Sequence, residues 1–175
     1  MLNSTQLHAS CVSIDGKGIL LLGPSGSGKS DLSLRLIDGG ATLVADDRVD
    51  VSIFPSPLVG EGGAKRRERG NSPQPQSRIE PPLPNPLPQG ERGLYASAPE
   101  KIHGLLEIRG VGILTFPAVT FAPLALAIKL VARSKVERLP EKQFFDCLGL
   151  QLPLLSLHAF DQSTAAKIIA TLVRL

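Results

Sequence analysis

A glycine-rich stretch near the N-terminus has the residue types and spacing that bind phosphate. It fits Gly-x-x-x-x-Gly-Lys-Ser in full. We expect Gly23, Gly26 and Gly28 to adopt positive φ angles and turn their N–H groups toward phosphate at the start of a helix. Lys29 would bridge the β and γ phosphates of ATP, and the Ser30 hydroxyl would bind Mg²⁺. A chance Gly/Ser-rich turn is the alternative. The residues assigned to nucleotide binding are Gly23, Pro24, Ser25, Gly26, Ser27, Gly28, Lys29 and Ser30.

Two adjacent carboxylates end the next apolar run along the chain. Asp46 and Asp47 follow residues 41–45, which predict a buried strand. Phosphoryl transfer needs a carboxylate near the metal ion and often a base near the acceptor hydroxyl, and two aspartates can divide these roles. A turn or a helix cap is the alternative for such a pair. Beside a phosphate loop we assign both aspartates to catalysis.

Local sequence alone does not decide the role of three further polar residues. His8 lies just before the strand that leads into the phosphate loop, where a lone histidine is by itself an ordinary surface or packed residue. Glu107 and Arg109 alternate on a predicted strand between glycines. A solvated sheet edge and a contact with metal or phosphate both fit this pair, so both interpretations stay open.

The segments that must position these residues predict an α/β fold. Residues 18–22 form an apolar run that predicts a buried strand entering the phosphate loop. Apolar spacing over 30–37 predicts the helix that follows, and Gly39 and Gly40 offer a left-handed cap at its end. Further extended segments are predicted at 93–97, 104–114, 124–131 and 152–157.

The C-terminal segment predicts a second helix over 163–175. Ser163 has the residue type of an N-cap. The apolar residues at helical spacing are Ala166, Ile169, Ala170 and Val173. The predicted architecture is therefore a sheet with flanking helices in a single domain over 1–175.

One segment differs in composition from the rest of the chain. Residues 54–93 hold nine of the fifteen prolines, and they contain an imperfect repeat of a Pro/Gly/Glu/Arg pattern. A stretch of this composition does not form a core. We predict a disordered insertion between two strands, and a proline-rich segment that docks a partner is the alternative.

Charge and composition argue against several function classes. The net charge is +3, and residues 54–93 supply six basic and four acidic residues, or +2 of it. With six Phe, one Tyr and no Trp, the chain lacks the mixture of aromatic and basic residues typical of nucleic-acid surfaces. Cys11 and Cys147 are far apart and outside any Cys/His cluster, so we expect two buried thiols and neither zinc nor a disulfide.

Hydropathy predicts neither a membrane segment nor a secretory leader. No apolar run reaches the roughly 18 residues that span a bilayer, and mean hydropathy is +0.11. The N-terminus lacks a basic region followed by an apolar stretch and a cleavage site. The expected location is the cytoplasm.

Several motifs together resemble the HPr kinase/phosphorylase family. They are His8-Ala9-Ser10, the phosphate loop, Leu43-Val44-Ala45-Asp46-Asp47, and Leu106-Glu107-Ile108-Arg109-Gly110-Val111-Gly112-Ile113, in the family's order and spacing. The similarity covers the chain apart from residues 54–93, but only the catalytic domain of the family. We expect the chain to lack the usual N-terminal domain of the family, as short forms of the enzyme do.

The resemblance implies a fold, a reaction and a partner. The family fold is an α/β P-loop domain related to phosphoenolpyruvate carboxykinase. Its members transfer phosphate from ATP to a serine of the phosphocarrier protein HPr in regulation of the phosphotransferase system, and many reverse this with inorganic phosphate. They form homo-oligomers, namely hexamers.

The resemblance also implies site residues. Lys29 corresponds to the catalytic lysine of the loop, and Ser30 and Glu107 correspond to Mg²⁺ ligands. Asp47 resembles the residue that accepts the serine proton in phosphorylation and returns it in the reverse reaction. The active-site histidine and arginine of the family correspond to His8 and Arg138.

Two departures from the family pattern leave alternatives open. Longer members have a basic Arg/Gly-containing loop for dephosphorylation where this chain has residues 152–156, so phosphorylase activity stays open. The segment 54–93 falls between Asp47 and Glu107, which keeps a catalytically impaired nucleotide-binding regulatory module as an alternative. A small-molecule P-loop kinase is the other, although the sequence has no evident arginine-bearing lid.

Overall fold

The computed structural model describes residues 4–55 and 92–175. The strands are β1 (Ser4–Leu7), β2 (Ala9–Ile14), β3 (Lys17–Leu22), β4 (Thr42–Ala45), β5 (Val49–Pro55), β6 (Arg92–Ser97), β7 (Leu105–Ile108), β8 (Gly112–Thr115), β9 (Phe121–Leu130), β10 (Gln143–Cys147) and β11 (Leu150–Leu157). The helices are α1 (Lys29–Asp38) and α2 (Thr164–Leu172), with short 3-10 helices η1 (Glu100–Ile102) and η2 (Arg133–Lys135).

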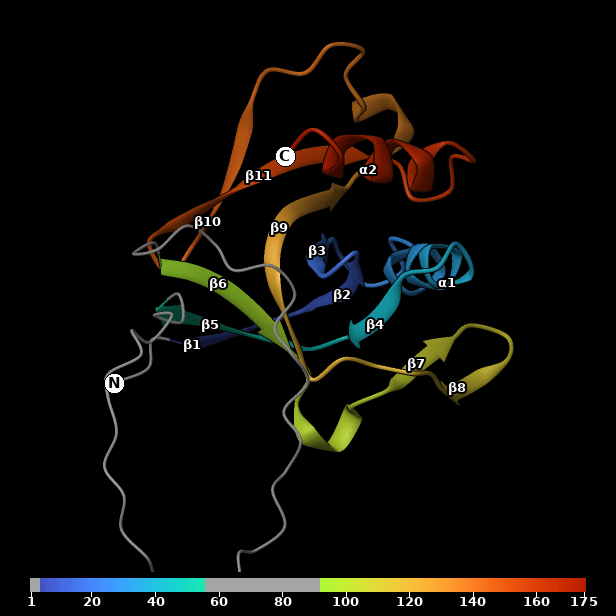
Figure 1. Cartoon of the computed structure of the whole chain (residues 1–175). Coiled ribbons are helices and arrows are strands. Elements are labelled where there is room, and N and C mark those ends of the chain that lie inside the picture. The colour runs from blue at the N-terminus through green and yellow to red at the C-terminus, as the bar shows by residue number, and fades with distance from the viewer. Residues whose placement is uncertain (1–3, 56–91) are drawn as a thin grey trace, which may run out of the picture.

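A mixed, curled sheet forms the centre of the fold (Figure 1). Its strand order is β1-β5-β6-β9-β3-β2-β4, and β11 and β10 extend it from β9. The long strand β9 causes the curl, because its first residues pair antiparallel with β6 and its later residues pair parallel with β3 and β11. Strands β7 and β8 form a separate hairpin. The predicted α/β class with a central sheet is confirmed.

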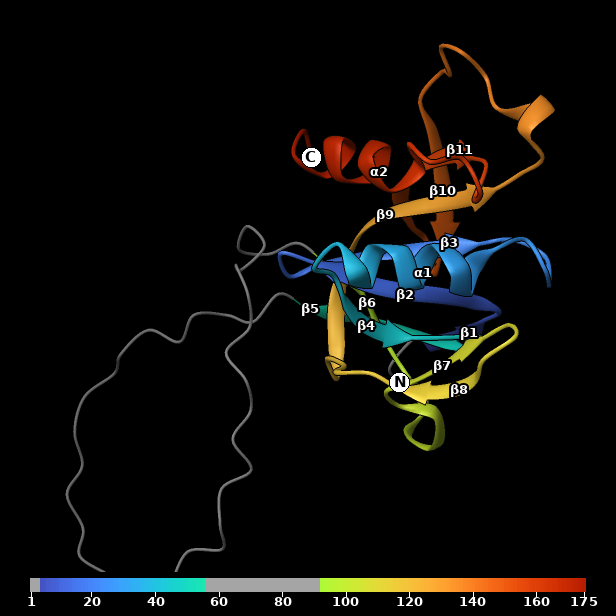
Figure 2. The same ribbon diagram turned by 90° about the vertical axis from the view of Figure 1, so that its right-hand side faces the viewer.

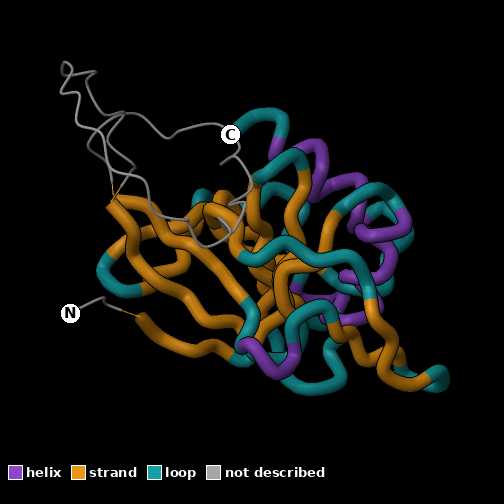
Figure 3. The backbone as a smooth tube through the Cα atoms, turned by 60° about the horizontal axis from the view of Figure 1, so that its bottom comes forward, coloured by secondary structure: helices purple, strands orange, loops and turns teal. Residues whose placement is uncertain are grey.

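The two faces of the sheet bury different side chains. Along β3, Leu20 points to one face while Ile19 and Leu21 point to the other, as the two-residue period of a strand requires. The Leu21 face packs against Leu32 of α1 and Ile168 of α2, so both helices lie on the same side (Figures 2 and 3). On the Leu20 face, the curled arms of the sheet close over their own core.

Most predicted elements occur close to their predicted positions. The segments 18–22, 30–37 and 41–45 are β3, α1 and β4 to within one residue, and Gly40 takes the left-handed conformation with φ +99°. The segment 104–114 is a hairpin rather than one extended run. Strands β1, β2, β5 and β10 were not predicted, because they are short and mix polar with apolar residues.

The C-terminal helix buries a different face from the predicted one. Its buried residues are Thr164, Ile168 and Leu172, whereas the predicted residues Ala166, Ile169, Ala170 and Val173 face outward, Val173 with 83% exposure. Ser163 stands before the helix as predicted but makes no side-chain cap hydrogen bond. The helix is apolar on more than one side, so spacing alone could not identify the side that meets the sheet.

The segment 54–93 begins and ends in paired strands. Phe54 pairs with Gly93 and Pro55 with Arg92 in the antiparallel ladder of β5 and β6. The two ends of the segment are therefore neighbours in the sheet. Residues 56–91 lie outside the described residues, and their predicted disorder stays a prediction.

Both cysteines are buried free thiols, as expected. Burial raises the pKa of Cys11 and of Cys147 above the usual range of a thiol. A raised pKa disfavours the reactive thiolate. Neither described α-helix is long and apolar enough to cross a membrane.

Replacement of a leucine at the centre of the sheet should test the core. Leu21 is fully buried between the sheet and both helices, so Leu21→Ala should lower the free energy of unfolding by roughly 2–5 kcal/mol. The matched change Leu139→Ala removes the same atoms from a side chain that is 88% exposed and should cost under about 0.5 kcal/mol. Denaturant unfolding measures both. Equal losses would contradict the assignment of Leu21 to the core.

Candidate phosphate-binding and catalytic site

The glycine-rich loop connects the central strand β3 to α1. Gly26 and Gly28 have φ angles of +78° and +92°, as the sequence predicted. Gly28 directly precedes α1, where a Cβ atom would lie 2.7 Å from Cβ of Ala159. Gly23 differs from the prediction, because its φ is not positive. Instead, a Cβ there would lie 2.5 Å from the Ser27 hydroxyl, so Gly23 is needed for close packing of the loop on itself.

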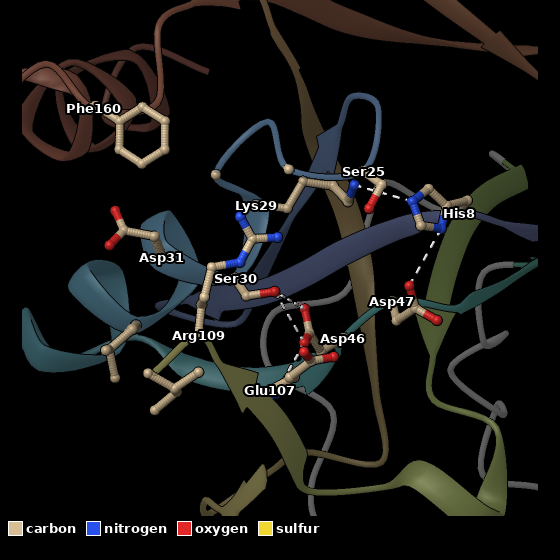
Figure 4. A pocket seen from close by; sticks show the side chains of 14 residues that line it. His8, Ser25, Lys29, Ser30, Asp31, Asp46, Asp47, Glu107, Arg109 and Phe160 are labelled. Carbon is tan, nitrogen blue, oxygen red and sulfur yellow. Dashed lines mark hydrogen bonds and ion pairs between the residues drawn. The ribbon is translucent and has the colours of Figure 1, made fainter. Parts of the chain in front are cut away.

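A line of three polar side chains crosses one end of the site (Figure 4). The Lys29 ammonium lies 3.2 Å from Nε2 of His8, and Nδ1 of His8 lies 3.3 Å from a carboxylate oxygen of Asp47. An ammonium has no acceptor, so Nε2 must accept and the imidazole proton must sit on Nδ1. In this tautomer the Nδ1–H group of His8 faces the Asp47 carboxylate.

The other hydrogen bonds of the Lys29 ammonium are to the backbone of the glycine-rich loop. Its ammonium donates to the carbonyl oxygens of Gly23 at 2.9 Å and Pro24 at 3.1 Å. Lys29 is only 7% exposed, and this burial lowers its pKa from the usual lysine value, while Asp47 and Asp46 act in the opposite direction. The lysine is therefore fixed at the loop before any phosphate is bound.

The carboxylate of Asp46 connects four elements. It follows β4, and it accepts hydrogen bonds from Ser10 of β2 at 2.6 Å, from Ser30 of α1 at 3.1 Å, and from the backbone N–H of Glu107 in β7 at 3.3 Å. A buried carboxylate is costly unless donors surround it. Asp46 is thus a fixed anion beside the Ser30 hydroxyl.

Asp47 projects to the opposite side from its neighbour. The backbone N–H of Arg48 donates to the carbonyl of Asp46 at 2.8 Å, and Asp47 between them has a φ of +65°. This tight turn is strained for a residue other than glycine. It leaves the Asp47 side chain 66% exposed beside His8. The two aspartates therefore have separate positions, as the division of roles between them requires.

These groups line one pocket of about 370 Å³. This volume falls in the range of small-molecule sites. The lining residues are His8, Ser25, Gly26, Gly28, Lys29, Ser30, Asp31, Leu34, Asp46, Asp47, Glu107, Ile108, Arg109 and Phe160. Glu107 and Arg109, for which the sequence left two interpretations, both line it.

Arg138 differs from the other predicted catalytic residues. It lies on the exposed segment between η2 and β10 and does not line the pocket. Gly23, Pro24 and Ser27 belong to the loop but do not line the pocket either. Gly23 and Pro24 contribute to the site indirectly, because their carbonyl oxygens accept hydrogen bonds from the Lys29 ammonium.

Sequence analysis did not assign Ser10, Asp31, Leu34, Ile108 or Phe160 to the site. A serine inside the apolar run of β2 indicated a buried hydrogen bond for Ser10, which Asp46 supplies. Asp31 and Leu34 follow the loop on α1, so helical spacing from Ser30 could have suggested them. No local pattern identified Phe160, which reaches the pocket only through the tertiary fold.

The donor set near Ser30 fits Mg²⁺ bound together with a nucleotide. Among the described residues, no group of three or more His, Cys, Asp or Glu could hold a metal ion alone. Mg²⁺ in phosphate sites usually needs only one or two carboxylates, with phosphate oxygens and water completing the shell. Ser30 and Asp46 provide a hydroxyl and a carboxylate in contact. Glu107 lines the same pocket, and its side-chain contact with metal stays a prediction.

A pair of glycine substitutions should separate backbone strain from steric conflict at the loop. Gly28→Ala and Gly40→Ala both force alanine to a positive φ, at about 1–2 kcal/mol. Only at Gly28 does the new Cβ also meet other atoms, at Ala159 and Phe160. Gly28→Ala should therefore lower the free energy of unfolding by an additional 1–3 kcal/mol or so, measured by denaturation. Equal losses would contradict the close approach at Gly28.

Comparison with known proteins identifies the relatives of the chain. The model of the HPr serine kinase C-terminal domain matches residues 1–68. An HPr kinase/phosphorylase from Caldanaerobacter subterraneus subsp. tengcongensis is 32% identical over 148 residues, covering 83% of this chain and 36% of that protein. One from Cupriavidus metallidurans is 30% identical over 179 residues, covering 96% of this chain and 44% of that protein. The chain thus spans less than half the length of these relatives.

A solved structure extends the similarity to the whole fold. The Hpr(Ser) kinase/phosphatase from Coxiella burnetii matches with a TM-score of 0.64 and 26% sequence identity. The match covers 97% of this chain and 88% of that one. The resemblance that the sequence motifs suggested is confirmed at the level of the family.

Proposed function

We propose that this chain, which resembles HPr serine kinase C-terminal domains and HPr kinase/phosphorylases, is an ATP- and Mg²⁺-dependent kinase that phosphorylates a serine of an HPr-like phosphocarrier protein. The observation that carries the proposal is the line from Lys29 through His8 to Asp47 beside the glycine-rich loop. This line supports the proposal, because a cation suited to phosphate and a carboxylate suited to accept a hydroxyl proton lie at the same end of the pocket.

The loop residues 23–30 hold the triphosphate of ATP. Their backbone N–H groups and the start of α1 attract the phosphate oxygens. Lys29 offsets negative charge on the transferred phosphoryl group, and it is held there by the carbonyls of Gly23 and Pro24. Ser30 and Asp46, with Glu107 nearby, would hold Mg²⁺, which neutralises charge on the β and γ phosphates.

Asp47 acts as the base in phosphorylation. Its carboxylate accepts the proton of the acceptor serine while the serine oxygen bonds to the γ phosphorus and the bond to the β-phosphate oxygen breaks, so that ADP leaves. His8 orients Asp47 through its Nδ1–H group. In phosphorolysis inorganic phosphate would bond to the phosphorus of phosphoserine and the bond to the seryl oxygen would break, which gives pyrophosphate, while a protonated Asp47 would return the proton to that oxygen.

The position of Asp47 favours a protein substrate over a small molecule. Its side chain lines the pocket and is 66% exposed. A serine carried on another folded protein can reach such a group, whereas a small-molecule kinase usually encloses its acceptor to exclude water. A homo-oligomer, which rests on the family resemblance, and a cytoplasmic location remain part of this proposal.

Substitution of the proposed base should separate chemistry from binding. With Mg-ATP the unsubstituted chain should phosphorylate HPr and fail to phosphorylate HPr whose target serine is alanine. Asp47→Asn should lower kcat by about 10²–10⁴-fold, because general base catalysis is lost, while the Kd for ATP changes little. Asp38→Asn, an exposed aspartate at the end of α1, is the matched control and should behave as the unsubstituted chain.

The same assay distinguishes the alternatives. ATP binding without phosphorylation of HPr would indicate a regulatory module that has lost catalysis. Phosphorylation of the serine-free HPr at an equal rate would also contradict the proposal.

Removal of the Ser30 hydroxyl should change the metal requirement. Ser30→Ala removes a proposed Mg²⁺ ligand that now contacts Asp46, so the Mg²⁺ concentration for half-maximal activity should rise about tenfold or more. Ser30→Thr keeps the hydroxyl and should restore most of the activity at low Mg²⁺. If both variants show the metal dependence of the unsubstituted chain, Ser30 is not a ligand.

A further inference from the structure

An exposed aromatic ring lines one end of the pocket. Phe160 lines the pocket from the segment between β11 and α2, and it is 57% exposed. Single exposed apolar side chains are common on protein surfaces, but this ring belongs to the lining of the pocket, where a ligand can contact it.

Polar contacts fix the segment that carries this ring. Side chains from α1, α2 and η2 make hydrogen bonds or an ion pair with this segment. The hydrogen bonds and ion pair are His158 with the Val131 carbonyl at 3.0 Å, Thr164 with the His158 carbonyl at 2.7 Å, Arg35 with the Ala159 carbonyl, and Arg133 with Asp161 at 2.9 Å. Phe160 is therefore held in place while its ring stays exposed.

The ring also contacts the start of α1. A Cβ atom at Gly28 would lie 2.9 Å from a carbon of the Phe160 ring, so the absence of a side chain at Gly28 lets the ring approach the phosphate loop. On its other side the ring packs edge-to-face on His158, with centroids 5.7 Å apart. These contacts hold the ring edge and leave much of its surface accessible.

The two ends of the pocket are lined by different residues, and Phe160 lies at the end away from Asp47. Figure 4 shows Phe160 and Asp31 on the side opposite to His8 and Asp47, with Ser30 and Asp46 between them. With the γ phosphate at the Asp47 end, a triphosphate that follows the loop past Ser30 directs the rest of the nucleotide toward Phe160.

We propose that Phe160 binds the nucleotide by stacking its ring on the base, and that this contact supplies affinity for ATP beyond that of the triphosphate. The proposal rests on the function proposed above. A phenyl ring stacks on any base because every base has a π face, and the fixed position of Phe160 lowers the entropy cost of the contact. Leu34 and Ile108 add apolar lining to the same pocket.

A comparison of ATP with a ligand that has no base tests the proposal. Calorimetric titration would measure the Kd of Mg-ATP and of Mg-tripolyphosphate for the full chain. Phe160→Ala should raise the Kd for ATP by about tenfold or more and leave the Kd for tripolyphosphate unchanged. Phe160→Tyr should keep ATP affinity. Phe144→Ala, which removes a ring of similar exposure from β10 outside the pocket, is the matched control and should change neither Kd.

A fluorescent variant gives a direct readout of stacking. The chain contains no tryptophan, so Phe160→Trp introduces a single indole. Stacking on adenine should quench its emission, and tripolyphosphate should not.

Four results would overturn the inference. An unchanged ATP Kd in Phe160→Ala would show that the ring does not contact the base. Equal loss for ATP and tripolyphosphate would show that Phe160 only supports the loop through Gly28. Weaker binding of HPr with unchanged ATP binding would assign the ring to the protein substrate. Absence of ATP binding to the unsubstituted chain would reject the proposed function together with this inference.

Discussion

The buried carboxylate of Asp46 is the interaction on which the site depends. It brings together Ser10 from β2, Ser30 from α1 and the backbone of Glu107 in β7, at distances of 2.6 to 3.3 Å. An anion removed from water requires such donors, and their loss would leave an uncompensated charge. The position of α1, and with it the phosphate loop, is therefore coupled to β4 and to the β7–β8 hairpin through one side chain.

The same constraint accounts for the exposure of Asp47. Because Asp46 is directed into the protein, its neighbour is turned outward through a tight turn with positive φ. His8, which precedes β2, then meets Asp47 on one side and Lys29 on the other. A central strand, a helix and two flanking strands thus bring an exposed aspartate, a buried lysine and a buried aspartate to one pocket.

The predictions from sequence agree with the structure where position depends on neighbours in the chain. The strand–loop–helix order around Gly28 and the acidic end of β4 follow from local residue types, and the structure places both at the pocket. Arg138 had no such local constraint, and it lies away from the pocket. The prediction of the buried face of α2 was also wrong. The helix has apolar residues on more than one side, and only its packing against the sheet determines that Ile168 and Leu172 are buried.

The sequence by itself determined the phosphate loop, the adjacent aspartates, the α/β class and the family resemblance, because each depends on residues within one short segment or on motif order. Only the tertiary structure decided that Asp46 faces Ser10 while Asp47 faces His8, and that Phe160 reaches a loop more than a hundred residues before it in the chain. The physical reason is that such contacts arise from sheet curvature and helix packing. Sheet curvature and helix packing result from many weak interactions between distant segments, and a local sequence pattern does not predict them.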